Sequence, residues 1–564
     1  MLTGIIIENF KGIRERVEIE LRPITLLFGG NSAGKSSILH ALQYATKIFE
    51  RRNLDAGSVG DGGTGVDLGG YQNFVHDHNP DLDITLGFNL KFNGNRSFLF
   101  ANVHFPRFRI SHNADSPRSL YQTPESGSVS LTIGWSNLLA APFVRRYAVI
   151  LDGTAIAEIQ YNPENDLGGD LLLNEQHPIF VRNSEHSALA VWHPDEAENL
   201  EESSVIGHLL GWAGLTCAVL VRRPEPAEPQ TRLPHPYTVF LRIACQKDAL
   251  PEFDDLFHID ADWDWGDAVP QSQKALLPDL YFYLTEAISQ IVLGPGRVLR
   301  KILADSRFLG PIREVPQRHY TRPRQAEQAR WSSGLGAWDR LETADDDFID
   351  AVNHWLGDEN CLNSGYRLRL KRFKELDLSD AIVVQLLTGR AFDEATAGDR
   401  LDLDSLPTQS RVLIVPVNGS IELRPNDVGV GISQVVPVIV TALDGSGWLI
   451  AIEQPELHIH PRLQAEIADL FLEASHKQQH QFLIETHSEH CILRLQRRIR
   501  ETSQGKPTPG RELMSEDVVV YYVSSDDNAT RVRRIDIDKH GDFVQPWPDD
   551  FFEIDFYERF GHDR

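Results

Sequence analysis

The stretch from Ile24 to Ala41, ITLLFGGNSAGKSSILHA, holds residue types that could bind phosphate. Its spacing is G-x-x-x-x-G-K-[ST], at Gly29, Gly34, Lys35 and Ser36. The glycines leave room for backbone N–H groups to wrap an anion, the lysine would reach the β- and γ-phosphates, and the serine hydroxyl would hold Mg²⁺. Because an apolar run precedes the motif and a helical apolar stripe follows it, we predict a loop that binds ATP or GTP rather than a plain glycine turn.

Four more candidate residues stand at a predicted helix start much further along the chain. The segment 427–438, DVGVGISQVVPV, places Gly429 and Gly431 just before Ser433 and Gln434. A helix N-terminus carries partial positive charge, so this segment predicts a second backbone cradle for an anion. Two phosphate cradles in one chain would fit one ligand only if a second copy supplied one of them.

Two predicted strands end in residues suited to metal binding and proton transfer. The strand 448–452 runs into Glu453 and Gln454, and the strand 481–485 is followed by Thr486, His487 and Ser488. Carboxylate oxygens are ligands that Mg²⁺ prefers. Glu485 and Glu489 are interpreted as residues that serve solubility rather than catalysis.

The surrounding segments predict an α/β protein. Alternating apolar and polar residues between positions 83 and 181 favour an antiparallel sheet, with Ala148–Ala157 as one of its strands. Helices are expected at Val205–Leu220 and Leu277–Leu303, with a proline-rich connector at 224–236 between them. No sustained heptads occur, so no long coiled coil is predicted.

Composition limits the classes of protein that this chain could be. It has 564 residues, a net charge of −26 and four widely spaced cysteines. Such an acidic chain is not a general nucleic-acid coat, and the cysteines indicate a reducing compartment. Neither a signal peptide nor a membrane span is expected, which favours a cytoplasmic location.

Arginines cluster in three segments that could face DNA or pair with the abundant carboxylates. These segments are 313–330, 367–374 and 494–500. Internal pairing is the favoured interpretation, and DNA remains a possible partner. Arg313, which follows a Gly-Pro turn, could reach a phosphate.

The order of motifs resembles that of the ABC-type ATPases of the RecF, Rad50, SMC and OLD group. G-x-N-x-x-G-K-S opens the chain, G-x-G-x-S-Q follows much later, and strands ending in E-Q-P-E-L-H-x-H-P and T-H-S come next. The compact ATPases of bacterial anti-phage defence, of the Septu type, are the most similar. The C-terminal segment looks like a short domain attached to one branch of these proteins.

The resemblance implies a head-to-head homodimer, or a higher homo-oligomer, with ATP and Mg²⁺ between the heads. It assigns the binding of ATP to Gly29, Asn31, Gly34, Lys35, Ser36 and Ser37 of one chain and to Gly429, Gly431, Ser433 and Gln434 of the partner chain. It assigns the binding of Mg²⁺ to Ser36, Gln72 and Glu453. It assigns catalysis to Glu453, Gln454, Glu456 and His487. His487 would match the switch histidine that senses the γ-phosphate.

Two departures from the pattern change the expected function. Gln454 stands where the group usually has an acid, and an amide cannot take a proton from water. Either Glu456 or His458 substitutes, or hydrolysis is slow and ATP acts as a clamp, which we favour. No strand after His487 ends in the carboxylate pairs of a TOPRIM nuclease, so the nuclease of the OLD proteins is not expected.

These features predict an ABC-type P-loop ATPase head, with an inserted mixed α/β region and a short C-terminal extension. The expected segments are 1–102 and 305–514 for the head, 103–304 for the insert and 515–564 for the extension. The expected function is a slow, ATP-dependent dimerising switch in anti-phage defence that gates a separate nuclease. The alternative is a RecF-type repair ATPase that loads on DNA with ATP turnover.

Overall fold

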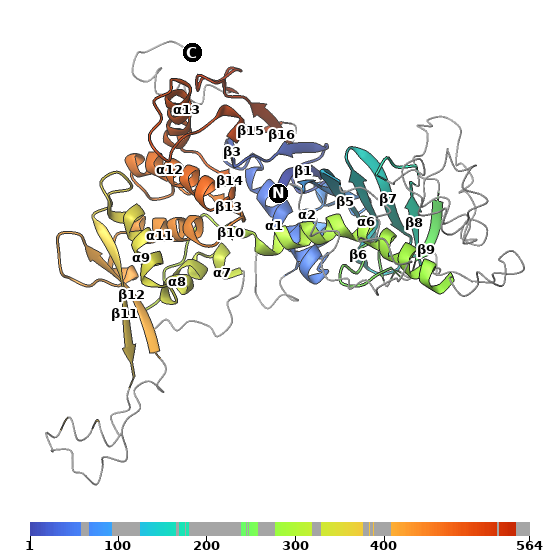
Figure 1. Ribbon diagram of the computed structural model, residues 1–564, viewed down its shortest axis with the longest axis horizontal. Coiled ribbons are helices and arrows are strands. Elements are labelled where there is room, and N and C mark those ends of the chain that lie inside the picture. The colour runs from blue at the N-terminus through green and yellow to red at the C-terminus, as the bar shows by residue number, and fades with distance from the viewer. Residues whose placement is uncertain are drawn as a thin grey trace, which may run out of the picture.

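The protein has two lobes joined by helices, as the ribbon in Figure 1 shows. The computed structural model describes residues 1–57, 67–92, 124–164, 168–174, 176–179, 239–243, 245, 247–257, 277–318, 329–375, 383, 387, 408–526 and 529–548. One lobe contains a mostly parallel sheet and the other an antiparallel sheet. The predicted α/β fold class is confirmed.

A mostly parallel sheet of six strands forms the first lobe. Its first five strands run parallel, and the last is antiparallel to its neighbour. In spatial order they are β10 (Arg307–Leu309), β13 (Leu449–Glu453), β14 (Gln481–Glu485), β3 (Ile24–Gly29), β15 (Val518–Asp526) and β16 (Ala529–Ile535). The central strand β3 is buried along its whole length, as its continuous apolar run predicts.

An antiparallel sheet of eight strands forms the second lobe. In spatial order they are β2 (Val17–Glu20), β1 (Leu2–Glu8), β4 (Ile84–Lys91), β5 (Ser126–Ser136), β6 (Ala141–Leu151), β7 (Thr154–Tyr161), β8 (Gly169–Leu173) and β9 (Val239–Ile243). The predicted antiparallel pairing is confirmed. The single strand expected over Ala148–Ala157 is wrong, because Asp152 and Gly153 adopt positive φ and turn the chain between β6 and β7.

Two helices fill the layer between the sheets. Helices α1 (Lys35–Arg51) and α6 (Leu277–Asp305) contribute to one core that also includes side chains from both sheets. The short α2 (Tyr71–Phe74), which the 3₁₀ turn η2 (His76–His78) follows, contributes Tyr71 and Phe74 to the same core. Helix α1 therefore occupies one face of the parallel sheet.

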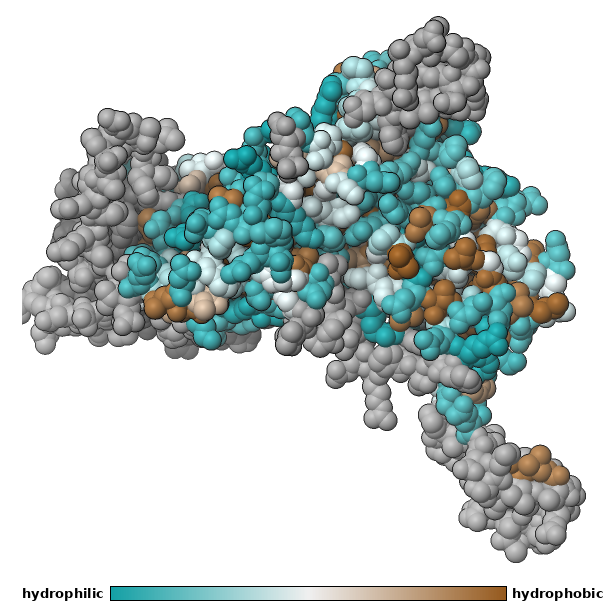
Figure 2. All heavy atoms as spheres, turned by 180° about the vertical axis from the view of Figure 1, so that it is seen from behind, coloured by the Kyte–Doolittle hydropathy of each residue, from teal (hydrophilic) through white to brown (hydrophobic). Residues whose placement is uncertain are grey.

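The other face of the parallel sheet carries a second core. The elements around it are α7 (Ala329–Ser332), α8 (Leu335–Glu342), α9 (Asp346–Gly357), α11 (Val430–Leu443), α12 (Pro461–Lys477), α13 (Glu489–Ser503) and the 3₁₀ turns η9 (Pro425–Asp427) and η10 (Ser515–Asp517). A two-stranded ribbon, β11 (Tyr366–Lys374) with β12 (Thr408–Pro416), projects from this lobe. Hydrophilic side chains cover much of the described surface in the rear view, and apolar ones gather mainly over this lobe (Figure 2).

Some expectations fall outside the described residues. The helix expected at 205–220 and the proline-rich connector at 224–236 are among them. The segment after 514, expected as an extension, contributes β15 and β16 to the six-stranded sheet. No helix in the described part of the chain is long and apolar enough to cross a membrane.

Candidate nucleotide-binding site

Parallel strand order brings the candidate residues to one edge of the sheet. β3, β13 and β14 all end there, and Glu453 lies directly opposite Glu485 in the register of the parallel pair. Paired residues of neighbouring strands point to the same face, about 4.8 Å apart along the hydrogen-bonding direction. The end of β3 continues into the predicted phosphate loop, 29–36, so the loop and the two carboxylates share this edge.

Lys35 and Ser36 start α1 and point into the site. The Lys35 side chain is 3% exposed, and its ammonium donates to the carbonyls of Gly29 at 3.1 Å and Gly30 at 2.7 Å. The Ser36 hydroxyl donates to Glu485 at 2.7 Å, and the other oxygen of that carboxylate lies 3.9 Å from the lysine nitrogen. Burial lowers the pKa of Lys35 and raises the pKa of Glu485. A negatively charged phosphate would stabilise the charged form of this buried lysine further.

Glu453, the expected Mg²⁺ ligand, is contacted from α1 and from the loop after β1. Burial first, and then the neighbouring Glu485 carboxylate, raise the pKa of Glu453 to about 7. Lys11 lies 2.6 Å from Nδ1 of His40, and Nε2 of that ring lies 3.9 Å from Glu453. Because burial lowers the pKa of His40 to about 4, the ring is neutral at pH 7 and its proton sits on Nε2, facing the carboxylate. Hydroxyl and carboxylate oxygens at this edge form a donor set that fits Mg²⁺.

Glu456 and His487 meet at the end of β14. One carboxylate oxygen of Glu456 accepts from the Thr486 hydroxyl at 2.8 Å, and the other accepts from the backbone N–H of His487 at 2.7 Å. Nε2 of His487 is buried without a hydrogen-bond partner among the described residues. Burial, followed by the charge of Lys35, lowers the pKa of His487, so the ring is neutral. It is available to a ligand that reaches this part of the site.

Gln454 is fixed by its backbone rather than by its side chain. Its φ of 44° is left-handed, and its N–H donates to the carbonyl of Glu485 at 2.7 Å. The guanidinium of Arg313 donates to the carbonyls of Glu453 at 2.8 Å and Gln454 at 3.1 Å. Arg313 is 1% exposed, and its guanidinium supports the turn after β13. A contact of Arg313 with a phosphate stays a prediction.

The second cradle lies at the start of α11. Gly429 is the N-cap and makes no side-chain cap, whereas Asp345, His460 and Ser488 cap α9, α12 and α13 with their own side chains. Helix α1 begins at Gly34 with the same lack of a side-chain cap. Both helix starts therefore leave backbone N–H groups open to an anion.

Ser433 and Gln434 of the signature are buried. The Ser433 hydroxyl donates to the carbonyl of Val430 at 3.0 Å. The Gln434 amide accepts from the backbone N–H of Arg313 at 3.0 Å and donates to its carbonyl at 2.6 Å. The resemblance assigns Gln434 to the nucleotide. In the structure, Gln434 holds the backbone of Arg313 and so connects α11 with the turn after β13. A Cβ on Gly431 would lie 2.7 Å from the carbonyl of His458, so glycine is needed there for close approach.

Comparison with known proteins agrees with this geometry. Residues 1–93 and 385–492 match the family described as "AAA ATPase domain". The chain contains a P-loop ATPase domain. Residues 513–553 match the family described as "Protein of unknown function (DUF3696)". No curated protein matches the chain.

The similar solved structures include several SMC heads. The SMC head bound to the C-winged helix domain of ScpA has 10% identity and a TM-score of 0.34, covering 95% of this chain and 98% of that one. The SMC head domain from Thermotoga maritima has 9% identity and a TM-score of 0.34, covering 95% and 99%. The Smc head with a coiled coil and joint from Pyrococcus yayanosii has 11% identity and a TM-score of 0.33, covering 96% and 98%.

The remaining predicted residues lie at the margin of the site. Asn31 is exposed in the phosphate loop, and Ser37 is buried in the first turn of α1. Gln72 is exposed on α2, and no hydrogen bond among the described residues joins its side chain to the loop. His458 is exposed and has a φ of 64°, which sets it apart from the buried carboxylates.

The sequence missed three residues of the site: Glu485, His40 and Lys11. Glu485 is 5% exposed and bound to Ser36, so its interpretation as a solubility residue is wrong. A glutamate at a strand end carries no signal of its own in one sequence. The strand order, which places β14 between β3 and β13, makes it part of the site.

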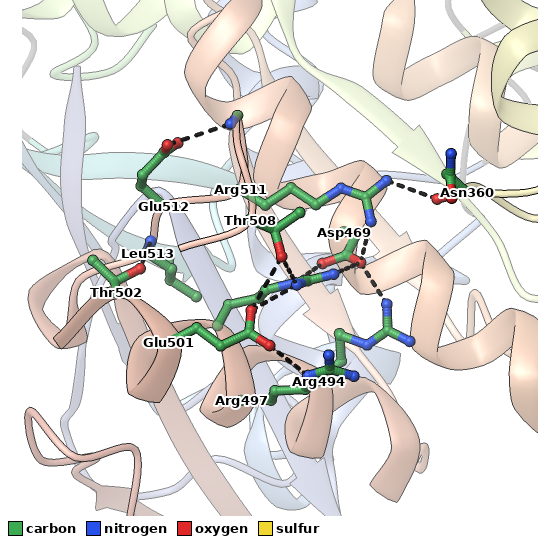
Figure 3. Close-up of polar contacts among 12 residues, drawn as sticks. Asn360, Asp469, Arg494, Arg497, Glu501, Thr502, Thr508, Arg511, Glu512 and Leu513 are labelled. Atoms are coloured by element: carbon green, nitrogen blue, oxygen red, sulfur yellow. Dashed lines mark hydrogen bonds and ion pairs between the residues drawn. The ribbon is translucent and has the colours of Figure 1, made fainter. Parts of the chain in front are cut away.

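The arginines of α13 pair inside the molecule, as favoured from the sequence. Asp469, which is fully buried, accepts hydrogen bonds from Arg494, Arg498 and Arg511 (Figure 3). On the ribbon, Arg369 and Lys371 both contact Glu422. These described basic side chains thus have carboxylate partners within the chain, as the internal-pairing interpretation predicts.

Proposed function

We propose that this chain is an ATP-dependent dimerising switch in bacterial anti-phage defence that gates a separate nuclease. The observation that carries the dimer is the position of the two uncapped helix starts. Helix α1 belongs to the core on one face of the parallel sheet, and α11 to the core on the other. With the sheet between them, the two starts of one chain would not enclose one triphosphate. A second copy related by a two-fold axis supplies the missing half.

The surface around the second cradle supports a protein partner there. Gly429 and Val430 are exposed, and the valine side chain is 55% exposed. Ile312 is 77% exposed and directly precedes Arg313. The backbone of Arg313 is hydrogen-bonded to Gln434, which lies one helical turn after Val430, so Ile312 is near Val430. Exposed apolar side chains next to an anion cradle fit burial against another chain better than contact with water.

The groups near the expected γ-phosphate favour slow hydrolysis. Gln454 cannot act as a base, and both carboxylate oxygens of Glu456 already accept hydrogen bonds. The neutral His487, with its unpartnered Nε2, is suited to sensing the phosphate rather than activating water. ATP bound by both cradles would hold the dimer closed, and its loss would release the effector.

The dimer is tested by measuring molecular mass in solution with and without Mg²⁺-ATP. ATP should increase the mass of the wild type, and K35A should abolish the increase. V430D should retain ATP binding but lose assembly, because it places a charge at the proposed interface. L138D alters a 70% exposed leucine on the other lobe and is the matched control. Assembly that persists in K35A or V430D would refute the dimer.

The defence role is tested by isolating the chain from its native host. Nuclease activity that co-purifies with it and responds to ATP supports gating, and an absence of such activity argues against it. Hydrolysis stimulated by DNA would favour the RecF-type repair ATPase instead.

A further inference from the structure

The hairpin of β15 and β16 lies directly against the phosphate loop. β15 runs parallel to β3, with Val523 opposite Gly29. A Cβ on Gly29 would lie 1.9 Å from the carbonyl oxygen of Val523. The first glycine of the loop is therefore in contact with the backbone of a strand made far later in the sequence.

Thr530 of β16 links two loops of the nucleotide-binding lobe. It is 7% exposed and lies opposite Ser525 in the hairpin. Its backbone N–H donates to the carbonyl of Gly12 at 2.7 Å, and its hydroxyl donates to the carbonyl of Ala33 at 3.2 Å. Gly12 belongs to the turn between β1 and β2, and Ala33 lies inside the phosphate loop.

The threonine side chain also occupies the space beside the second glycine of the motif. Gly34 has a φ of +100°, and a Cβ there would lie 2.2 Å from the Thr530 hydroxyl oxygen. A Cβ on Gly12 would lie 2.6 Å from the same oxygen. Both positions therefore need glycine because Thr530 is there, in addition to any contact with phosphate.

Peptide geometry connects the Ala33 hydrogen bond with anion binding. In a planar trans peptide the carbonyl of one residue and the N–H of the next point in opposite directions. Since the Ala33 carbonyl is held by Thr530, the N–H of Gly34 must point away from the hairpin. No backbone acceptor for this N–H occurs in the described part of the chain, and Gly34 makes no side-chain cap for α1. Such an N–H is free to bind phosphate.

We propose that Thr530 is a positioning residue for the phosphate loop, because its hydroxyl fixes the Ala33–Gly34 peptide with the N–H facing the nucleotide. This assigns a part in nucleotide binding to the segment 513–553, which matches a family of unknown function. The inference rests on the proposed function only in that the loop binds a nucleotide, and it needs neither a dimer nor an effector.

The test compares the affinities of T530V and T530S for Mg²⁺-ATP and Mg²⁺-ADP. Valine keeps the shape of threonine without the hydroxyl, and serine keeps the hydroxyl. T530V should weaken both nucleotides about 5-fold, the effect of one neutral hydrogen bond, because loop N–H groups hold the α- and β-phosphates that ATP and ADP share. T530S should bind like the wild type. S525A, which removes an exposed hydroxyl from the same hairpin, is the control.

Thermal unfolding without nucleotide separates positioning from stability. A T530V protein with wild-type unfolding and weakened binding supports the inference. Wild-type affinity in T530V, or equal weakening in T530S and T530V, would overturn it. A wild-type protein that binds Mg²⁺-ATP without any increase in molecular mass would instead refute the dimer, and the inference about Thr530 would stand.

Discussion

Replacing Glu485 by glutamine should shift the pH dependence of Mg²⁺-nucleotide binding to lower pH. The Glu485 carboxylate accepts a hydrogen bond from the Ser36 hydroxyl at 2.7 Å. The pKa of Glu453 is raised to about 7 by two causes: burial is the larger, and the charge of Glu485 is the second. Mg²⁺ needs the Glu453 carboxylate in its ionised form. Binding by the wild type should therefore strengthen as pH rises through 7.

The expected size follows from that pKa. The Glu453 carboxyl is about nine-tenths ionised at pH 8 and about one-tenth ionised at pH 6, so affinity should fall about 10-fold between them. In E485Q the repulsion between the two carboxylates is gone, so the pKa of Glu453 should be lower. The fall in Mg²⁺-nucleotide affinity between pH 8 and pH 6 should therefore be smaller. Glutamine still accepts from Ser36, so at pH 8 the change from a charged to a neutral acceptor should cost about 5-fold or less.

The assay is a titration with Mg²⁺ at fixed nucleotide, at pH 6, 7 and 8, with a metal-free series as baseline. E516Q, which changes an exposed carboxyl on η10, should keep the wild-type profile. Identical midpoints in the wild type and E485Q would refute the coupling between the two carboxylates. A loss of more than about 100-fold at every pH would instead show that the hydrogen bond to Ser36 outweighs the charge.

Three further predictions concern the buried cluster, the catalytic turn and the loop. D469N should lower the free energy of unfolding by about 3–5 kcal/mol in urea titrations, because it removes the buried carboxylate that Arg494, Arg498 and Arg511 share. Q454E should raise steady-state phosphate release at least about 10-fold by supplying a base, and an unchanged rate would contradict slow hydrolysis through the amide. G34A should abolish nucleotide binding in equilibrium dialysis, since its Cβ would meet Thr530 at 2.2 Å in a left-handed backbone; binding within about twofold of wild type would contradict this.

The parts of the fold that the sequence predicts are those encoded in short stretches. The phosphate loop, the strand before it and α1 follow from one motif and its apolar flanks. The antiparallel lobe follows from alternation, although alternation alone does not reveal the Asp-Gly turn after residue 151. These features depend on neighbours along the chain, so one sequence is enough to find them.

The parts that the sequence could not provide depend on strand order. Glu485 joins the site because β14 lies between β3 and β13, and nothing in its own segment says so. Arg313 turns inward because Gln434 binds its backbone from a segment far along the chain. The position of β15 beside β3 is likewise a long-range pairing without a local signal.

The place of β15 in the sheet also bears on biosynthesis. Until β15 leaves the ribosome, β3 has a bare edge whose N–H and C=O groups lack partners on that side. Translation at ~5–20 residues per second separates the two strands by a time on the order of half a minute or more. A nascent chain therefore needs protection at that edge, and a fragment cut back to the matched ATPase segments would expose it permanently and aggregate.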